Sequence, residues 1–261
     1  MRFSRFWLWR VPAALALVAG AVFTVGFWLA MRSSSGSPIG AAPPPPAPRE
    51  APKASGRRIV LVLGDSLSHG TGDPTGRGYA ADVVAALQRR GRVESVNLAV
   101  AGAESSDLRK LVESANVRSL AASADVILLS VGGNDLSHSL SSAGAPAQAI
   151  SSLGDSRSRF AENLRTILRG LRDVNPSAPI RLLGLYQPFG GAGREARAGE
   201  SLVLSWNSVL TETALGYANV AVVPVFDLFQ DRSDRLATDR FHPNRAGYRA
   251  IADRVIQTLS L

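Results

Sequence analysis

The sequence contains no cysteine. This absence excludes disulfide bonds, thiolate zinc sites, cysteine nucleophiles and a lipid attached to an N-terminal cysteine. Histidine is also scarce, with three residues in 261, so a histidine base has few candidates. The sequence has no internal repeat and no DNA- or RNA-binding motif, and we therefore expect no nucleic-acid partner.

The net charge of +8 does not change that expectation. Residues 1–56 carry six basic side chains and one acidic side chain, whereas residues 57–261 carry 23 basic and 20 acidic side chains. Only two of the 29 basic residues are lysine, a bias that we interpret as genome composition. The excess of positive charge therefore lies mostly outside the main part of the chain.

A long uncharged run, "VPAALALVAGAVFTVGFWLA", occupies residues 11–30. As a helix it would span about 30 Å, the thickness of the hydrocarbon core of a membrane. Three arginines precede the run and only Arg32 closely follows it, which predicts a cytoplasmic N-terminus by the positive-inside rule. We therefore expect a cytoplasmic basic segment at residues 1–10, a single-pass transmembrane signal-anchor at 11–30, and the rest of the chain on the extracytoplasmic side.

A cleaved secretory signal is the alternative. The run is longer than the apolar region of most signals, and it lacks a small-x-small cleavage site because Trp28 occupies the −3 position if Ala30 is −1. We favour the uncleaved anchor, although a cleaved segment would make the protein secreted. Residues 31–56 are rich in Pro, Ser and Gly, which predicts a disordered linker before a folded domain at 57–261.

From residue 57 onward, apolar runs alternate with helix-like stretches. This alternation predicts an α/β fold whose parallel sheet has helices on both faces. Pro224 lies in the fifth run and has no N–H to donate, so we expect that strand at an edge, as in the order 2-1-3-4-5. The expected strands are 58–63, 93–98, 125–131, 180–185 and 220–226, and the expected helices are 78–90, 104–122, 157–173, 196–216 and 245–259.

Two short motifs follow the first two predicted strands. In "GDSL", residues 64–67, a glycine turn presents Ser66 at the start of a helix, where a serine is either a nucleophile or a helix cap. In "NLAVAGAES", residues 97–105, Gly102 lets the backbone approach a ligand and donate an N–H to an oxyanion. The alternative for Gly102 is a plain turn glycine.

Two further motifs follow the third strand and precede the last helix. In "GGND", the amide of Asn134 is an oxyanion donor that does not titrate, unless it forms an Asx turn. In "DRFHPN", His242 is a candidate general base and Asp239 is its orienting acid. The alternative is a loop histidine with Asp239 capping the helix.

Together, the motifs supply every group that acyl transfer requires. They also make the sequence resemble the SGNH, or GDSL, family of bacterial esterases and lipases. The resemblance extends over residues 58–260 and includes "GDSLSHGTGD", "GLYQPF" at 184–189 and "VFDLF" at 225–229. It implies a flavodoxin-like three-layer α/β/α sandwich.

The resemblance also implies the role of each site residue. Ser66 is the nucleophile, His242 the base and Asp239 its partner, while Ser66, Gly102 and Asn134 form the oxyanion hole. The implied function is a serine ester hydrolase that cleaves lipid or small acyl esters without a metal or organic cofactor. An O-acetyl esterase for cell-wall glycans and a non-catalytic lipid- or carbohydrate-binding module stay open. We make no prediction of the oligomeric state.

Four apolar residues are candidates for an acyl-binding site, although core packing explains them equally well. We expect the segments 137–156 and 186–200 to border the pocket, with the glycines near 190–193 forming a mobile lid. Asp65 and Asp135 are expected to brace the loops by hydrogen bonds. The substrate-binding candidates are Leu67, Leu136, Tyr186 and Phe189.

Overall fold

The computed structural model describes residues 56–141, 146–188 and 194–259. The predicted basic segment at 1–10, the anchor at 11–30 and all but the last residue of the 31–56 linker lie outside these residues. Within the described ranges, no helix combines the length and hydropathy that a membrane span requires.

Five parallel strands form one sheet in the order β2-β1-β3-β4-β5, and this order confirms the prediction. The central strands read as continuous apolar runs because both of their faces are covered: Val60 to Gly64 and Val126 to Ser130 are buried throughout. The strands are β1 (Arg57–Gly64), β2 (Arg92–Asn97), β3 (Val126–Ser130), β4 (Ile180–Leu183) and β5 (Val220–Val223).

The fifth strand lies at an edge, as its proline predicted. The strand is shorter than expected, because β5 ends at Val223 and Pro224 follows it directly. Proline cannot extend the hydrogen-bond ladder, and the chain turns instead into a short helix at Phe226–Phe229. Pro224 therefore ends the strand rather than interrupting it.

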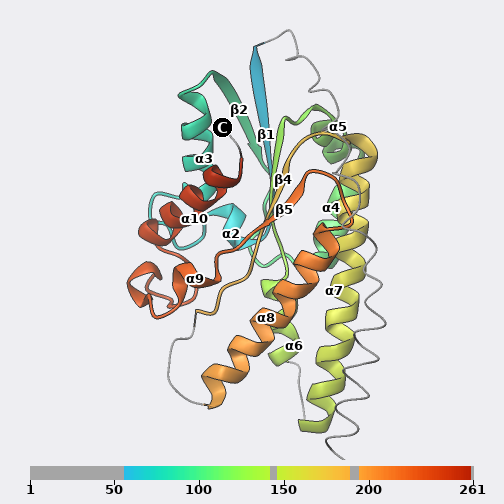
Figure 1. Ribbon diagram of the computed structural model, residues 1–261, viewed down its shortest axis with the longest axis vertical. Coiled ribbons are helices and arrows are strands. Elements are labelled where there is room, and N and C mark those ends of the chain that lie inside the picture. The colour runs from blue at the N-terminus through green and yellow to red at the C-terminus, as the bar shows by residue number, and fades with distance from the viewer. Residues whose placement is uncertain (1–55, 142–145, 189–193, 260–261) are drawn as a thin grey trace, which may run out of the picture. The chain divides into compact units, whose positions relative to one another are not determined.

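Helices cover both faces of the sheet and give the predicted three layers (Figure 1). Helices α2, α3, α9 and α10 lie on one face, and α4, α5, α7 and α8 lie on the other. Their bounds are α2 (Ser66–His69), α3 (Gly78–Gln88), α4 (Ser105–Glu113), α5 (Ala115–Ser123), α6 (Gly133–Ser141), α7 (Pro146–Val174), α8 (Arg194–Ala214), α9 (Phe226–Phe229) and α10 (Arg245–Thr258).

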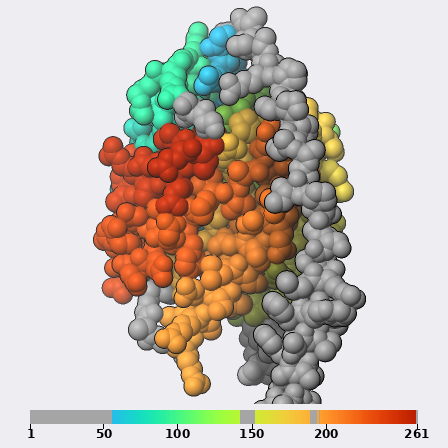
Figure 2. Space-filling model, viewed as in Figure 1, coloured from blue at the N-terminus to red at the C-terminus, as the bar shows by residue number. Residues whose placement is uncertain are grey.

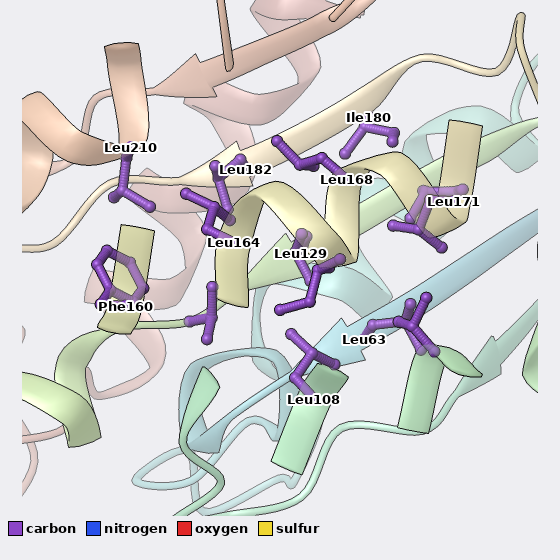
Figure 3. Close-up of a cluster of buried hydrophobic side chains, with 14 of the residues drawn as sticks. Leu63, Leu108, Leu129, Phe160, Leu164, Leu168, Leu171, Ile180, Leu182 and Leu210 are labelled. Atoms are coloured by element: carbon purple, nitrogen blue, oxygen red, sulfur yellow. The ribbon is translucent and has the colours of Figure 1, made fainter. Parts of the chain in front are cut away.

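The larger of the two cores lies between the sheet and α7. Leu164, Leu168 and Leu171 recur at helical spacing along α7 and are fully buried against the sheet, as Figure 3 shows. Leu129 of β3 and Leu182 of β4 face them. This packing fixes the strands whose carboxyl ends carry the predicted motifs.

Two predicted helices differ from the structure. The stretch 104–122 is two helices, because Ser114 adopts an extended conformation between them and its Oγ accepts a hydrogen bond from the N–H of Val117. The helix expected at 157 begins instead at Pro146, since proline is favoured in the first helical position. The segment 137–156 is therefore largely helical rather than a loop.

Several helices extend past the carboxyl ends of the strands. Figure 1 shows α6 and the first halves of α7 and α8 continuing beyond the edge where the strands end. In the space-filling view of Figure 2, the first turns of α8, in light orange, project from the described surface. These helices form a wall beside the edge of the sheet that carries the motifs.

Candidate active site

Ser66 is the first residue of α2, directly after β1. The preceding residue, Asp65, is the N-cap, and its Oδ1 accepts a hydrogen bond of 3.0 Å from the N–H of Leu67. The alternative in which Ser66 caps the helix is therefore wrong. Ser66 is buried, and its hydroxyl makes no hydrogen bond among the described residues.

His242 is held by Asp239 in the segment before α10. Its Nδ1 lies 2.7 Å from Oδ2 of Asp239, whose Oδ1 accepts hydrogen bonds from the backbone N–H groups of Phe241 and His242. The N-cap of α10 is Asn244, so the alternative in which Asp239 caps the helix is wrong. A proton on Nδ1 leaves Nε2 of His242 as the basic nitrogen.

The charge of Asp239 suits this pairing. Burial raises the pKa of its carboxyl, but the hydrogen bonds from His242 and from two backbone N–H groups outweigh burial and lower the pKa below its ordinary value. Asp239 is therefore ionised at neutral pH. An ionised partner stabilises the positive charge that His242 gains when it accepts a proton.

The segments that carry Ser66 and His242 are packed together. A Cβ built on Gly72 would lie 2.7 Å from Cβ of His242, so only glycine fits there. From α10, the Tyr248 hydroxyl donates a hydrogen bond of 2.6 Å to the carbonyl of Thr71. The turn that follows Ser66 is therefore in contact with both His242 and the helix that comes after it.

The two other predicted oxyanion donors lie in loops that are bonded to each other. Gly102 has φ +84°, a conformation that favours glycine. Nδ2 of Asn134, in α6, donates a hydrogen bond of 2.8 Å to the carbonyl of Ala103, next to Gly102. The N–H of Val100 donates to the carbonyl of Gly64, which ties the same loop to the end of β1. The second N–H of the Asn134 amide is available to a ligand.

Asp135 braces these loops, as predicted. Its Oδ2 accepts a hydrogen bond of 3.0 Å from the N–H of Ser105, and its Oδ1 accepts another from the Ser105 hydroxyl. Burial raises the pKa of Asp135, and the bonds from Ser105 oppose that rise. The start of α4 is thereby joined to the start of α6, which carries Asn134.

Comparison with known proteins identifies the family. The model of the GDSL-like lipase/acylhydrolase family matches residues 62–250. The chain belongs to this family. This membership supports a hydrolase function, and the matched range includes all four motifs.

The chain is also similar to individual proteins. The uncharacterized protein YpmR of Bacillus subtilis (strain 168) is 29% identical over 207 residues, which cover 77% of this chain and 81% of that protein. The lipase Lip_vut3 from a goat rumen metagenome has a TM-score of 0.69 at 23% identity, over 77% of this chain and 97% of that one. The acetylxylan esterase Axe2 of Geobacillus stearothermophilus has a TM-score of 0.58 at 19% identity, over 78% of this chain and 94% of that one. These two structures share the fold.

In this GDSL-like hydrolase, the predicted substrate-binding residues are part of the two cores. Leu67 and Tyr186 belong to the cluster on one face of the sheet and Leu136 to the cluster on the other. The Tyr186 ring stacks on Phe229, and its hydroxyl donates to the carbonyl of Phe241. Core packing accounts for these three positions, and their contact with substrate stays a prediction. Phe189 lies outside the described residues.

Two cavities open near the motifs. One of about 340 Å³ lies beside Gly64 and Gly102, between their loops and the residues Leu108 and Leu111 of α4. The other, of about 890 Å³, is lined by Arg240 and by neighbours in the segment before His242. Within the described residues, no group of three or more His, Asp or Glu side chains has the arrangement of a metal site.

Sequence reasoning missed several residues that support the site. Ser130, Ser68 and Tyr79 form a buried chain of hydroxyl groups next to Asp65. Ser130 had a visible signal, since it is a polar residue that ends the apolar run "VILLS" at the functional edge. Tyr248 had no such signal in the sequence, because a tyrosine at helical spacing is typical of an ordinary core residue.

Proposed function

We propose that this GDSL-like hydrolase is a serine ester hydrolase in which Ser66 is the nucleophile. The observation that carries the proposal is the 2.7 Å contact between His242 and Asp239, in a segment packed against the turn that follows Ser66. A serine is activated when an imidazole that is oriented by a carboxylate can accept its proton.

The reaction has two halves. In the first, the Ser66 oxygen bonds to the ester carbonyl carbon while its proton moves to Nε2 of His242. Collapse of the tetrahedral intermediate breaks the carbon–oxygen bond of the ester, and the leaving alcohol takes the proton from His242. In the second half, a water molecule repeats these steps on the acyl-serine, which releases the acid and restores Ser66.

Negative charge that develops on the carbonyl oxygen needs donors that are already in position. We assign this role to the backbone N–H groups of Ser66 and Gly102 and to Nδ2 of Asn134. Loss of one such donor typically lowers kcat by about 10²–10³-fold. Asp239 holds His242 in the tautomer that the reaction requires.

The ester substrate is either a lipid or small acyl ester or, alternatively, an O-acetyl group on a cell-wall glycan. The lipase Lip_vut3 and the acetylxylan esterase Axe2 share this fold, so each alternative has one counterpart among similar structures. The apolar residues Leu108 and Leu111 beside the 340 Å³ cavity favour an acyl chain. Rates on p-nitrophenyl esters from acetate to palmitate separate the two, because an acetyl-specific pocket loses activity beyond the shortest chains.

A fluorophosphonate probe tests the nucleophile. We expect a single serine adduct in the full-length protein, abolished in Ser66→Ala and reduced in His242→Ala. Ser123→Ala, which removes an exposed hydroxyl at the end of α5, is the control and should label as the unmodified protein does. Labelling that persists in Ser66→Ala would contradict the proposal. Inertness to the probe and to the ester series, with retained binding to lipid vesicles or glycan, would favour the non-catalytic module.

We also propose that residues 11–30 anchor the protein in the membrane with its hydrolase domain outside the cytoplasm. The support is the uncharged run and the arginines before it. Full-length protein should remain with membranes after a carbonate wash, and a chain that begins at residue 57 should not. Release of the full-length chain by the wash would contradict the anchor.

A further inference from the structure

Ser130, the last residue of β3, lies at the centre of a buried hydrogen-bond cluster. Its side chain is 1% exposed. Its Oγ lies 2.6 Å from Oδ1 of Asp65 and 2.8 Å from Oγ of Ser68, and the backbone N–H groups of Asp65 and Ser68 donate to it at 3.3 and 3.2 Å. A hydroxyl offers one proton and two lone pairs, so the two N–H groups occupy the lone pairs, and Asp65 and Ser68 share the single proton.

The cluster surrounds the residue that carries the proposed nucleophile. The N–H groups of Asp65 and Ser68 are bound by Ser130, and the N–H of Leu67 is bound by Asp65. The N–H of Ser66 has no partner among the described residues. Ser130 thus fixes the backbone on both sides of Ser66 and leaves one N–H of the turn for a ligand.

Ser130 is in close contact with the Ser66 turn, residues 64–68, at the end of β1. Gly64 pairs with Ser130 across the sheet, and a Cβ built on Gly64 would lie 2.2 Å from the Ser130 carbonyl oxygen and 2.6 Å from its Oγ. Four residues after Ser130, the same chain reaches Asn134. One short segment therefore holds the Ser66 turn and leads into α6, which carries the Asn134 amide.

We propose that Ser130 is a positioning residue for ester hydrolysis. Its hydroxyl holds the Ser66 turn in the orientation that aims the Ser66 oxygen and N–H at one carbonyl group. This role rests on the proposed function of Ser66. Ser130 does not touch the substrate, so it acts on kcat through the geometry of Ser66 rather than on substrate binding.

The test compares Ser130→Ala and Ser130→Thr with the unmodified full-length protein on p-nitrophenyl acetate. A displacement near 1 Å at a reacting group lowers rates by roughly 10²-fold. We expect Ser130→Ala to lose on the order of 10²-fold in kcat with KM within about threefold. Ser130→Thr keeps the hydroxyl and should recover most of the rate.

Ser208→Ala is the control. Ser208 is half-buried in α8, where its hydroxyl donates to the backbone carbonyl of Ser205 and accepts a hydrogen bond from Arg157. Ser130→Ala loses more hydrogen bonds and should lower the unfolding temperature more, and only Ser130→Ala should lower kcat.

Three results would overturn the positioning role. They are a kcat in Ser130→Ala within threefold of the unmodified protein, equal losses of kcat in Ser130→Ala and Ser208→Ala, and no recovery in a folded Ser130→Thr. Each of these requires an active unmodified enzyme, and so each leaves the proposed function intact. An unmodified protein that neither hydrolyses esters nor reacts with fluorophosphonate would overturn the proposed function, and the role of Ser130 with it.

Discussion

The hydroxyl of Tyr248 lies 3.4 Å from the carbonyl oxygen of Ser66, although 182 residues separate them in the sequence. The same hydroxyl lies 2.6 Å from the carbonyl of Thr71. Tyr248 belongs to α10, which begins three residues after His242. The helix that follows the proposed base therefore also contacts the backbone of the proposed nucleophile and of the residues after it.

Replacing Tyr248 by phenylalanine removes this contact and keeps the buried ring. We expect the free energy of unfolding to fall by about 1 kcal/mol, the net contribution of one hydrogen bond. We expect kcat on p-nitrophenyl acetate to fall by roughly 10-fold, since the Ser66 turn is less firmly held. Denaturant titration and steady-state kinetics measure the two effects.

Tyr217→Phe is the control for this prediction. The Tyr217 hydroxyl donates to the carbonyl of Arg165, away from the candidate active site. Its loss should lower stability slightly and leave kcat unchanged. Equal kcat values for Tyr248→Phe and the unmodified protein would show that the contact does not affect the geometry of the site.

Asp239→Asn tests the partner of His242. The amide is unable to stabilise a positive imidazole as the carboxylate does, so we expect kcat to fall by roughly 10²–10⁴-fold at an unchanged KM. Asp234→Asn is the control, because Asp234 forms an exposed ion pair with Arg232 nearby, and such pairs contribute little. Similar kinetics for both variants would argue against the assigned role of Asp239.

Gly64→Ala and Gly76→Ala test the close packing between β1 and β3. Both glycines have positive φ, but a Cβ on Gly64 meets the backbone of Ser130, whereas one on Gly76 meets nothing within 4 Å. Gly76→Ala should cost about 1–2 kcal/mol from backbone conformation alone. Gly64→Ala should lower the free energy of unfolding clearly more, as measured by urea denaturation. Equal losses in the two variants would mean that β3 shifts away from a Cβ at position 64 without cost.

Asp65→Asn tests how the pKa of Asp65 affects stability at different pH values. Burial raises the pKa of Asp65 above its ordinary value of 3.8, although the hydrogen bonds from Ser130 and from the N–H of Leu67 oppose the rise. As the pH increases from 3.8 to the folded pKa, the unfolded chain loses this proton more readily than the folded chain, so folding becomes less favourable. Asparagine does not titrate and keeps the Oδ1 acceptor.

The unfolding temperature of Asp65→Asn, relative to the unmodified protein, should therefore rise with pH from about 3.8 and level off above the folded pKa. Thermal unfolding at a series of pH values measures this difference. For Asp73→Asn, the difference in unfolding temperature should instead fall as the pH rises toward 3.8. Burial raises the pKa of Asp73, but bonds from Thr75 and Gly78 and the charge of Arg245 outweigh it and lower the pKa. If the difference in unfolding temperature between Asp65→Asn and the unmodified protein does not change with pH, the raised pKa of Asp65 is contradicted.

The sheet could be predicted from the sequence because its central strands are buried on both faces. Such strands appear as uninterrupted apolar runs, and the proline after Val223 identified the edge. The ends of helices were harder to predict. The break at Ser114 depends on one capping hydrogen bond, and the early start at Pro146 lies in a segment whose composition is typical of a loop.

The candidate site was predictable where its residues form short motifs near strand ends. Asp239 and His242 are three residues apart, so their pairing is visible in the sequence. The contacts that bring Ser130 and Tyr248 to the Ser66 turn join residues 62 to 182 positions apart. Such pairs depend on strand register and on helix packing, which local patterns do not determine.

The pairing of Gly64 with Ser130 has a consequence for how this chain tolerates insertions. A single residue added within β3 would shift every later position by one and turn Ser130 toward the opposite face. It would disturb the apolar core and the Ser66 turn together, so loss of fold and loss of function should coincide there. The outer turns of α8 project from the described surface, and length changes there should be tolerated better, because they leave this pairing in place.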